Sequence, residues 1–149
     1  MVVFGDLFVK SKGQPIKYKG RTVQMWDQFP VPKGQSRLRF RFVSTDSEWT
    51  QGVSLKTKGN FIANEEVVKK PLGLWEHTAP REGTIVCDSK DGFIEVVNVW
   101  DTGDGVVESW HNGAAMIVEE IKGGRRYYCN DGHLDDDFTD LVFELVIEP

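Results

Sequence analysis

The chain contains few of the residues that build disulfides and transition-metal sites: two cysteines and three histidines in 149 residues. Cys87 and Cys129 lie far apart, and neither has a second cysteine or a histidine at the spacing of a zinc site, so we expect two buried, reduced thiols. The spacing of His77, His111 and His133 matches no histidine-ligated motif. A disulfide framework and a histidine-ligated transition-metal site therefore both lack support.

Long apolar runs and targeting features are also missing. No apolar stretch approaches the roughly 18 to 20 residues needed to cross a bilayer. The first residues, Met1–Asp6, lack the basic segment, apolar core and cleavage site of a signal peptide. We expect a cytoplasmic protein that does not associate with a membrane, with leaderless export as the alternative. The composition, 40% hydrophobic and 28% charged, is that of a single globular domain over residues 1–149, and there is no linker or repeat.

Motifs for nucleophilic catalysis and for nucleotides are absent, because the chain has no Gly-x-Ser-x-Gly, phosphate loop or dinucleotide fingerprint. Arg37, Arg39 and Arg41 form a cationic stripe on one face of a predicted strand. A protein of pI 5.2 is nevertheless a poor candidate for binding nucleic acid. We expect the arginines to pair with acidic residues on neighbouring strands, within the chain or across a homo-oligomer.

The net charge of −5 is unevenly distributed. Residues 1–43 hold nine basic residues against two acidic ones, a balance of +7, and the remaining residues have a balance of −12. Five aspartates and no basic residue fall between Asn130 and Asp140. The acidic excess of the chain therefore lies in one short segment.

Period-two patterns predict a fold made of strands. Arg37–Val43 alternates strictly between apolar and basic residues, and Phe93–Trp100 is apolar on both faces, as expected of a central strand. The further predicted strands are Val2–Val9, Trp49–Leu55, Val106–Trp110, Ala115–Ile121 and Leu141–Ile147. Only Asn60–Lys70 has helical character, which Pro71 would end. We expect an all-β fold, a single antiparallel β-sandwich of jelly-roll type with at most one short helix.

The aspartate-rich segment predicts a calcium site. Its carboxylates repel one another, by only about 1 kcal/mol per pair in water but by more in a partly buried turn. Asp135, Asp137 and Thr139 stand at i, i+2 and i+4, so their side chains can converge on one centre. The side-chain oxygens of Asp140 and Asn130 could complete the shell, while the intervening Phe138 would point into the core. Calcium takes about six to eight oxygens and tolerates irregular geometry.

The same segment carries a family resemblance. Asn-Asp-Gly-x-x-Asp-Asp-Asp-Phe-Thr-Asp-Leu-Val-Phe resembles the Asp-Gly-(x)-Asp-x-Asp-(Phe/Tyr)-Asn-Asp signature of calcium-binding β-sandwiches. The nearest such family is the calcium-dependent bacterial lectins that bind fucose and mannose, and secreted adhesin-type domains carry a similar run. The resemblance implies that Asp135, Asp137 and Asp140 coordinate calcium, with Asn130 in the place of an acidic ligand. Thr139 departs from the usual Asn, and we expect one ion.

Exposed aromatic residues could supply a sugar-binding surface, because aromatic rings stack on the apolar faces of sugars. Trp26, Trp110, His111 and Asn112 are the candidate ligand-binding residues. The stretch from Phe93 through Trp110 and Asn112 also resembles the strand-turn-strand of starch-binding modules. We therefore expect a calcium-binding, lectin-like module with carbohydrate as its partner.

Two alternatives remain open at this point. The first is a small calcium-dependent β-sandwich enzyme, a lyase, isomerase or cyclase, with His111 as acid or base and Glu108 or Asp101 orienting it. The second is a structural or interaction protein that calcium stiffens, for which the uneven charge predicts oligomers.

Overall fold

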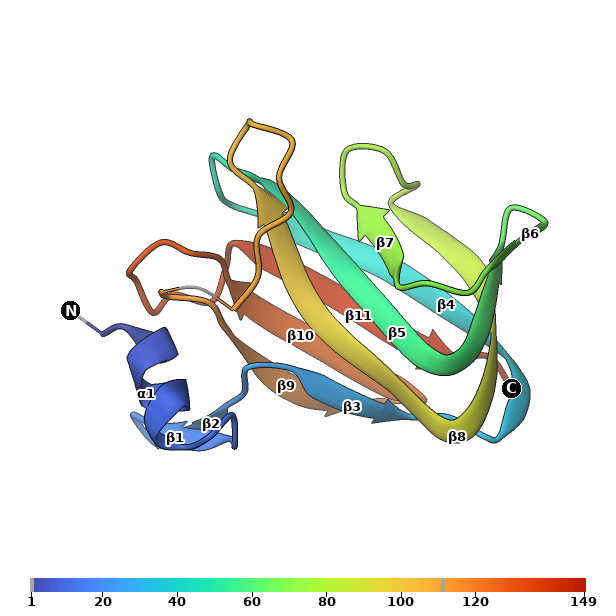
Figure 1. The fold of residues 1–149 in the computed structure, drawn as a ribbon, viewed down its shortest axis with the longest axis horizontal. Helices are drawn as coiled ribbons and strands as arrows, with labels where there is room; N and C mark the ends of the chain where they lie inside the picture. The colour runs from blue at the N-terminus through green and yellow to red at the C-terminus, as the bar shows by residue number, and fades with distance from the viewer. Residues whose placement is uncertain (1, 111) are drawn as a thin grey trace.

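The structure is a computed structural model that describes residues 2–110 and 112–149 (Figure 1). Over these residues the chain forms one helix and eleven strands, and every strand pair is antiparallel. The elements are α1 (Phe4–Lys10), β1 (Ile16–Tyr18), β2 (Arg21–Val23), β3 (Asp27–Pro30), β4 (Gly34–Thr45), β5 (Thr50–Ala63), β6 (Glu66–Val68), β7 (Leu72–Trp75), β8 (Glu82–Asp101), β9 (Ala115–Ile121), β10 (Gly124–Asn130) and β11 (Leu141–Ile147). The predicted all-β, sandwich-like class is confirmed.

One large sheet supplies both layers of the sandwich. Its strand order is β6-β5-β8-β4-β11-β10-β9, with β3 beside β8 and β7 beside β5. The long strand β8 connects the layers, because its first half pairs with β4 and its second half pairs with β3. Strand β5 follows β8 through the bend, and Figure 1 shows both curving across the layer that contains β11 and β10. The register of β5 against β8 shifts between the pairs Thr57–Ile94 and Gly59–Ser89, so Lys90–Gly92 form a bulge in β8, with Gly92 at a φ of 82°.

The alternating pattern of β4 produces a buried face and a charged face. Leu38, Phe40 and Phe42 lie in the main core, as predicted. The outward arginines pair with carboxylates of β11 and of the residue that follows it, at N–O distances of 3.0 Å for Arg37–Glu148, 3.3 Å for Arg39–Glu148 and 3.7 Å for Arg41–Glu144. The expected cross-strand pairing therefore occurs within one chain. Exposed pairs of this kind contribute about 0–1 kcal/mol each.

Both cysteines belong to the core. Cys87 and Cys129 are buried and are not bonded to each other. Burial raises the pKa of the Cys87 thiol to about 11 and raises the pKa of Cys129 as well, because a thiolate is poorly solvated there. The thiols therefore act as apolar packing groups, as the sequence predicted.

The N-terminal segment is helical, and its predicted strand, Val2–Val9, is wrong. Phe4 and Phe8 stand four residues apart, which places them on one face of a helix. Both are buried in a second apolar cluster together with Val23 and Phe138. This spacing of four, supported by packing against distant residues, outweighs the short period-two pattern.

Two other predicted elements differ from the structure. The predicted helix at Asn60–Lys70 is the hairpin of β5 and β6, because Asn64 and Glu65 both have positive φ and make its two-residue turn. The predicted strand at Val106–Trp110 is a loop that touches β8 through one bridge, between Trp100 and Glu108. Among the described residues, no helix is long and apolar enough to cross a membrane.

Candidate metal centre

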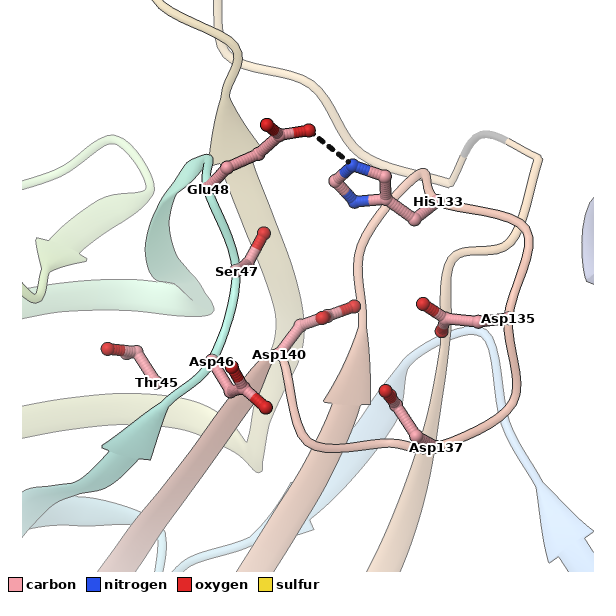
Figure 2. A pocket seen from close by; sticks show the side chains of 8 residues that line it. All are labelled: Thr45, Asp46, Ser47, Glu48, His133, Asp135, Asp137 and Asp140. Carbon is pink, nitrogen blue, oxygen red and sulfur yellow. Dashed lines mark hydrogen bonds and ion pairs between the residues drawn. The ribbon is translucent and has the colours of Figure 1, made fainter.

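The acidic segment forms the loop between β10 and β11 and faces the loop between β4 and β5 (Figure 2). Together they border an open cavity of about 510 Å³. The lining side chains are mostly carboxylates and hydroxyls, from Thr45, Asp46, Ser47, Glu48, His133, Asp135, Asp137 and Asp140. The loops meet because Thr45 pairs with Leu141 in the sheet, and the amide of Asp46 donates to the carbonyl of Asp140 at 3.1 Å.

Buried contacts fix the shape of the acidic loop. The side-chain amide of Asn130 donates to the carbonyl of Asp135 at 2.9 Å, and its oxygen accepts from the amide of Phe138 at 2.8 Å. Phe138 has a φ of 57° and is 2% exposed, with its ring 5.6 Å from that of Phe4. The prediction that Phe138 anchors the loop to the core is confirmed.

Asp136 lies on the side of the loop that meets the N-terminal segment. Its Oδ2 accepts from the hydroxyl of Tyr18 and from Nζ of Lys19, each at 2.9 Å. These contacts with Lys19 and Tyr18 lower the pKa of Asp136. This aspartate is therefore paired with a cation of the chain itself.

Asp135, Asp137 and Asp140 point toward one another (Figure 2). One carboxylate oxygen from each lies within 4.8 Å of the others. Two ligands on opposite sides of an ion, each bound at about 2.4 Å, would be about 4.8 Å apart, so these three oxygens can share one ion of calcium size. Asp140 is 3% exposed and forms the base of the cluster, whereas Asp135 and Asp137 are exposed.

Without a cation, this cluster carries an electrostatic cost. Burial, followed by repulsion from Asp131, Asp135 and Asp137, raises the pKa of Asp140 to about 7, although the amide of Asp131 donates to it. Burial and the neighbouring carboxylates Asp137 and Asp131 also raise the pKa of Asp135. A bound cation would remove this repulsion, and carboxylate oxygens are the donors that hard divalent cations prefer.

A second group, Asp131, His133 and Asp140, also has ligand atoms within 4.8 Å of one another. The members of this group already form hydrogen bonds with one another. Asp131 is fully buried and accepts from Ser47 Oγ at 2.6 Å, Gln51 Nε2 at 3.0 Å and the His133 amide at 3.0 Å. Burial opposes ionisation of Asp131, but the hydrogen bonds from Ser47 and His133 outweigh it and lower the pKa.

His133 joins the two loops. Its Nδ1 lies 2.7 Å from Asp131 and its Nε2 lies 3.0 Å from Glu48, while its ring stacks on Trp49 with 3.7 Å between centroids. Burial would lower the pKa of His133, but the hydrogen bonds to Glu48 and Asp131 raise it. Because carboxylates occupy both ring nitrogens, His133 acts as a link between the loops, and the all-oxygen group is the stronger metal candidate.

The raised pKa of Asp140 predicts a stability that falls with rising pH. Between its ordinary value of 3.8 and about 7, the folded protein holds a proton that the unfolded chain has lost, so the free energy of unfolding decreases as pH rises through this window. The raised pKa of His133 acts in the same direction near neutral pH. Asp131 and Asp136 have lowered pKa values, so they contribute to the free energy of unfolding while they are ionised. The protein loses this contribution only below about pH 4, where the two carboxylates become protonated.

We therefore expect the melting temperature in chelator to fall between pH 5 and pH 8, and the fall to be smaller in Asp140→Asn. Thermal unfolding followed by circular dichroism measures both slopes. A wild-type melting temperature that increases across this range would contradict the assignment.

Sequence comparisons leave the chain without a family: no protein-family model matches it, and no curated protein matches it. Among solved structures, the C-terminal domain of BC2L-C lectin from Burkholderia cenocepacia matches with a TM-score of 0.46 and 16% sequence identity. The match covers 82% of this chain and 94% of the lectin domain.

The structure brings together three of the five predicted metal ligands: Asp135, Asp137 and Asp140. Asn130 is buried under the loop, where its side chain is hydrogen-bonded to backbone groups at both ends. Thr139 is exposed, lies outside the cavity lining and donates its amide to Asp137 Oδ1 at 3.2 Å. Asn130 and Thr139 therefore support the shape of the loop in this structure.

Trp26, Trp110 and Asn112 do not line the acidic cavity. Trp26 and Trp110 line two other pockets, and the carbonyl of the exposed Asn112 accepts from the amide of Gly5 at 2.7 Å. His111 lies outside the described residues. Oδ1 of Asp101 accepts hydrogen bonds from the amides of Gly103 and Gly105 in its own turn.

Sequence reasoning missed the opposite wall of the cavity. Neither Asp46 nor Glu48 was predicted as a site residue, and Asp131 was not singled out as the partner of His133. The two acidic residues within residues 45–48 were the only sign of this wall in the sequence. The pairing of β4 with β11 is what shows that residues 45–48 face the aspartate loop.

Proposed function

We propose that Asp135, Asp137 and Asp140 bind one calcium ion, and that the protein is a calcium-dependent carbohydrate-binding module. The observation that carries this proposal is the convergence of three carboxylates at the edge of an open cavity. The neighbouring Asp136 is paired with Lys19, so Asp135, Asp137 and Asp140 form a group separate from that ion pair.

The donor set fits calcium better than other common ions. All three ligands are carboxylates, whereas zinc favours sulfur and nitrogen donors. Magnesium requires near-ideal octahedral geometry and usually retains waters or phosphates. Three carboxylates supply three to six of the roughly six to eight oxygens that calcium takes. The remaining coordination positions would face the cavity.

Sugar hydroxyls suit those open positions, because adjacent hydroxyls present two neutral hard oxygens at once. The opposite wall offers the carboxylates of Asp46 and Glu48 as acceptors. The many carboxylates around the cavity would repel an anionic ligand. Neutral sugars are therefore the proposed ligands, and sialylated or sulfated glycans are not expected to bind.

Calorimetric titration with calcium tests the metal part of the proposal. We expect binding by the wild type and by Asp136→Asn, but not by Asp137→Asn. Asp136→Asn is the matched control, because the carboxylate that it removes belongs to the same loop but contacts Tyr18 and Lys19 and is not part of the cluster. Equal calcium affinity in Asp137→Asn and the wild type would overturn the ligand assignment.

A glycan screen in calcium and in chelator tests the sugar part. Binding of neutral glycans that disappears with chelator and in Asp137→Asn is the expected result. Calcium binding without any glycan binding would instead favour the alternative of a calcium-stiffened interaction protein. The contacts of Asp136 and Phe138 with the N-terminal segment provide a route for such stiffening.

A further inference from the structure

A second groove runs along the outer face of β8, away from the acidic cavity. Two pockets, of about 290 and 380 Å³, share Lys56 and Glu95 as lining residues, and these two residues are register partners on β5 and β8. Phe93 lines one pocket and Val97 and Val99 line the other. These residues alternate along one face of β8 and span about 20 Å from Phe93 to Val99. The two pockets therefore form one elongated groove.

Aromatic side chains stand at both ends of this groove. Trp26 and Phe93 line one end, and Trp75 and Trp110 line the other. Trp110 is 47% exposed and Phe93 is 40% exposed, although large aromatic residues normally bury most of their surface. Four aromatic rings bordering one groove form an amphipathic surface rather than a scattered set of exposed residues.

The local backbone favours these ring positions. Gly52 is the register partner of Trp75, and a Cβ at Gly52 would lie 2.8 Å from the indole, so the absent side chain makes room for the ring. Trp110 has a φ of 59°, a left-handed conformation that is strained for a bulky residue. Such strain gathers at functional sites.

The polar lining indicates the class of ligand. Two lysines, Lys56 and Lys58, balance two carboxylates, Asp91 and Glu95, so the groove has no net charge. Hydroxyls and an amide, from Ser54, Thr57, Ser109 and Gln28, also line the two pockets. A ligand with apolar faces, hydroxyl edges, no charge and an extended shape matches this lining. A linear neutral oligosaccharide has these properties.

We infer that this groove binds a linear neutral oligosaccharide by stacking on Trp75 and Trp110, independently of the calcium site. The inference rests on the carbohydrate part of the proposed function but not on its metal ion. The acidic cavity would recognise hydroxyls through the ion, whereas the groove would hold a chain along its length.

The test is calorimetric titration with a panel of neutral hexasaccharides, cellohexaose, maltohexaose and mannohexaose, in excess chelator. We expect at least one to bind, and to bind about tenfold or more weakly in Trp110→Ala and in Trp75→Ala, a loss of about 1.4 kcal/mol, because each substitution removes a stacking ring. Trp110→Phe should retain part of the affinity. Val67→Ala, which removes an exposed apolar group outside the groove, should leave it unchanged.

Several results would overturn the inference. They are no binding by any hexasaccharide in chelator, binding that survives both tryptophan substitutions, and Trp110-dependent binding of a proline-rich peptide in place of the sugars. Sugar binding that needs calcium and is lost in Asp137→Asn would place the ligand at the acidic cavity. That result would overturn the inference about the groove and would leave the proposed function intact.

Discussion

Calcium at one hundred times its dissociation constant is expected to raise the free energy of unfolding by about 2.7 kcal/mol, because the ion binds only the folded chain. For a protein of this length, that increase corresponds to roughly 5–10 °C in melting temperature. The physical cause is relief of repulsion among Asp135, Asp137 and Asp140, which adds to burial in raising the pKa of Asp140 to about 7. Thermal melts with calcium, with magnesium and with chelator measure the effect.

Asp140→Asn gives this prediction a sharper form. Removing a buried, repelled carboxylate should raise the melting temperature in chelator and, at the same time, abolish the gain from calcium. A destabilised variant that still responds to calcium would contradict the role assigned to Asp140. Asp136→Asn should keep the full calcium response, since this residue pairs with Lys19 on the other side of the loop.

Phe138→Ala is expected to lower the free energy of unfolding by about 3–5 kcal/mol, the usual cost of removing a buried aromatic ring. The ring of Phe138 packs against Phe4 of α1 and lies under the guanidinium of Arg21, 5.3 Å from the ring centroid. Without this ring, α1 loses a packing contact and the loop that contains Asp135, Asp137 and Asp140 loses its anchor to the core, so both segments should become more mobile. Urea unfolding gives the stability, and calcium titration gives the effect on affinity.

Leu134→Ala is the matched control for that substitution. Leu134 belongs to the same loop but is 39% exposed, so its truncation should change stability by about 0.5 kcal/mol or less. Equal costs for the two variants would show that Phe138 does not anchor the loop.

Strands whose alternation is regular could be predicted well. Ala115–Ile121 and Leu141–Ile147 have the predicted bounds as β9 and β11, because apolar, β-branched runs between turn residues determine strands locally. The helix α1 could not be predicted in the same way. A helix of seven residues is marginal by itself, and this one is stabilised by packing against Phe138, far along the chain.

In the candidate site, too, the features set by local sequence could be predicted and those set by strand pairing could not. The i, i+2 spacing of Asp135 and Asp137 predicted that they converge, and Asp140 was expected to complete the shell. Thr139, the third residue of that spacing, does not line the cavity. The cavity wall formed by Asp46 and Glu48 depends on the pairing of β4 with β11, which no local pattern contains. Trp26 and Trp110 were predicted as ligand-binding residues, but which face of the sandwich they occupy depends on the sheet topology.

The most direct test of the metal assignment is a crystal structure of the protein grown in calcium. The assignment predicts one anomalous peak about 2.3–2.6 Å from a carboxylate oxygen of each of Asp135, Asp137 and Asp140. A structure with ample calcium and no peak there, in which those three carboxylates contact only solvent, would contradict it.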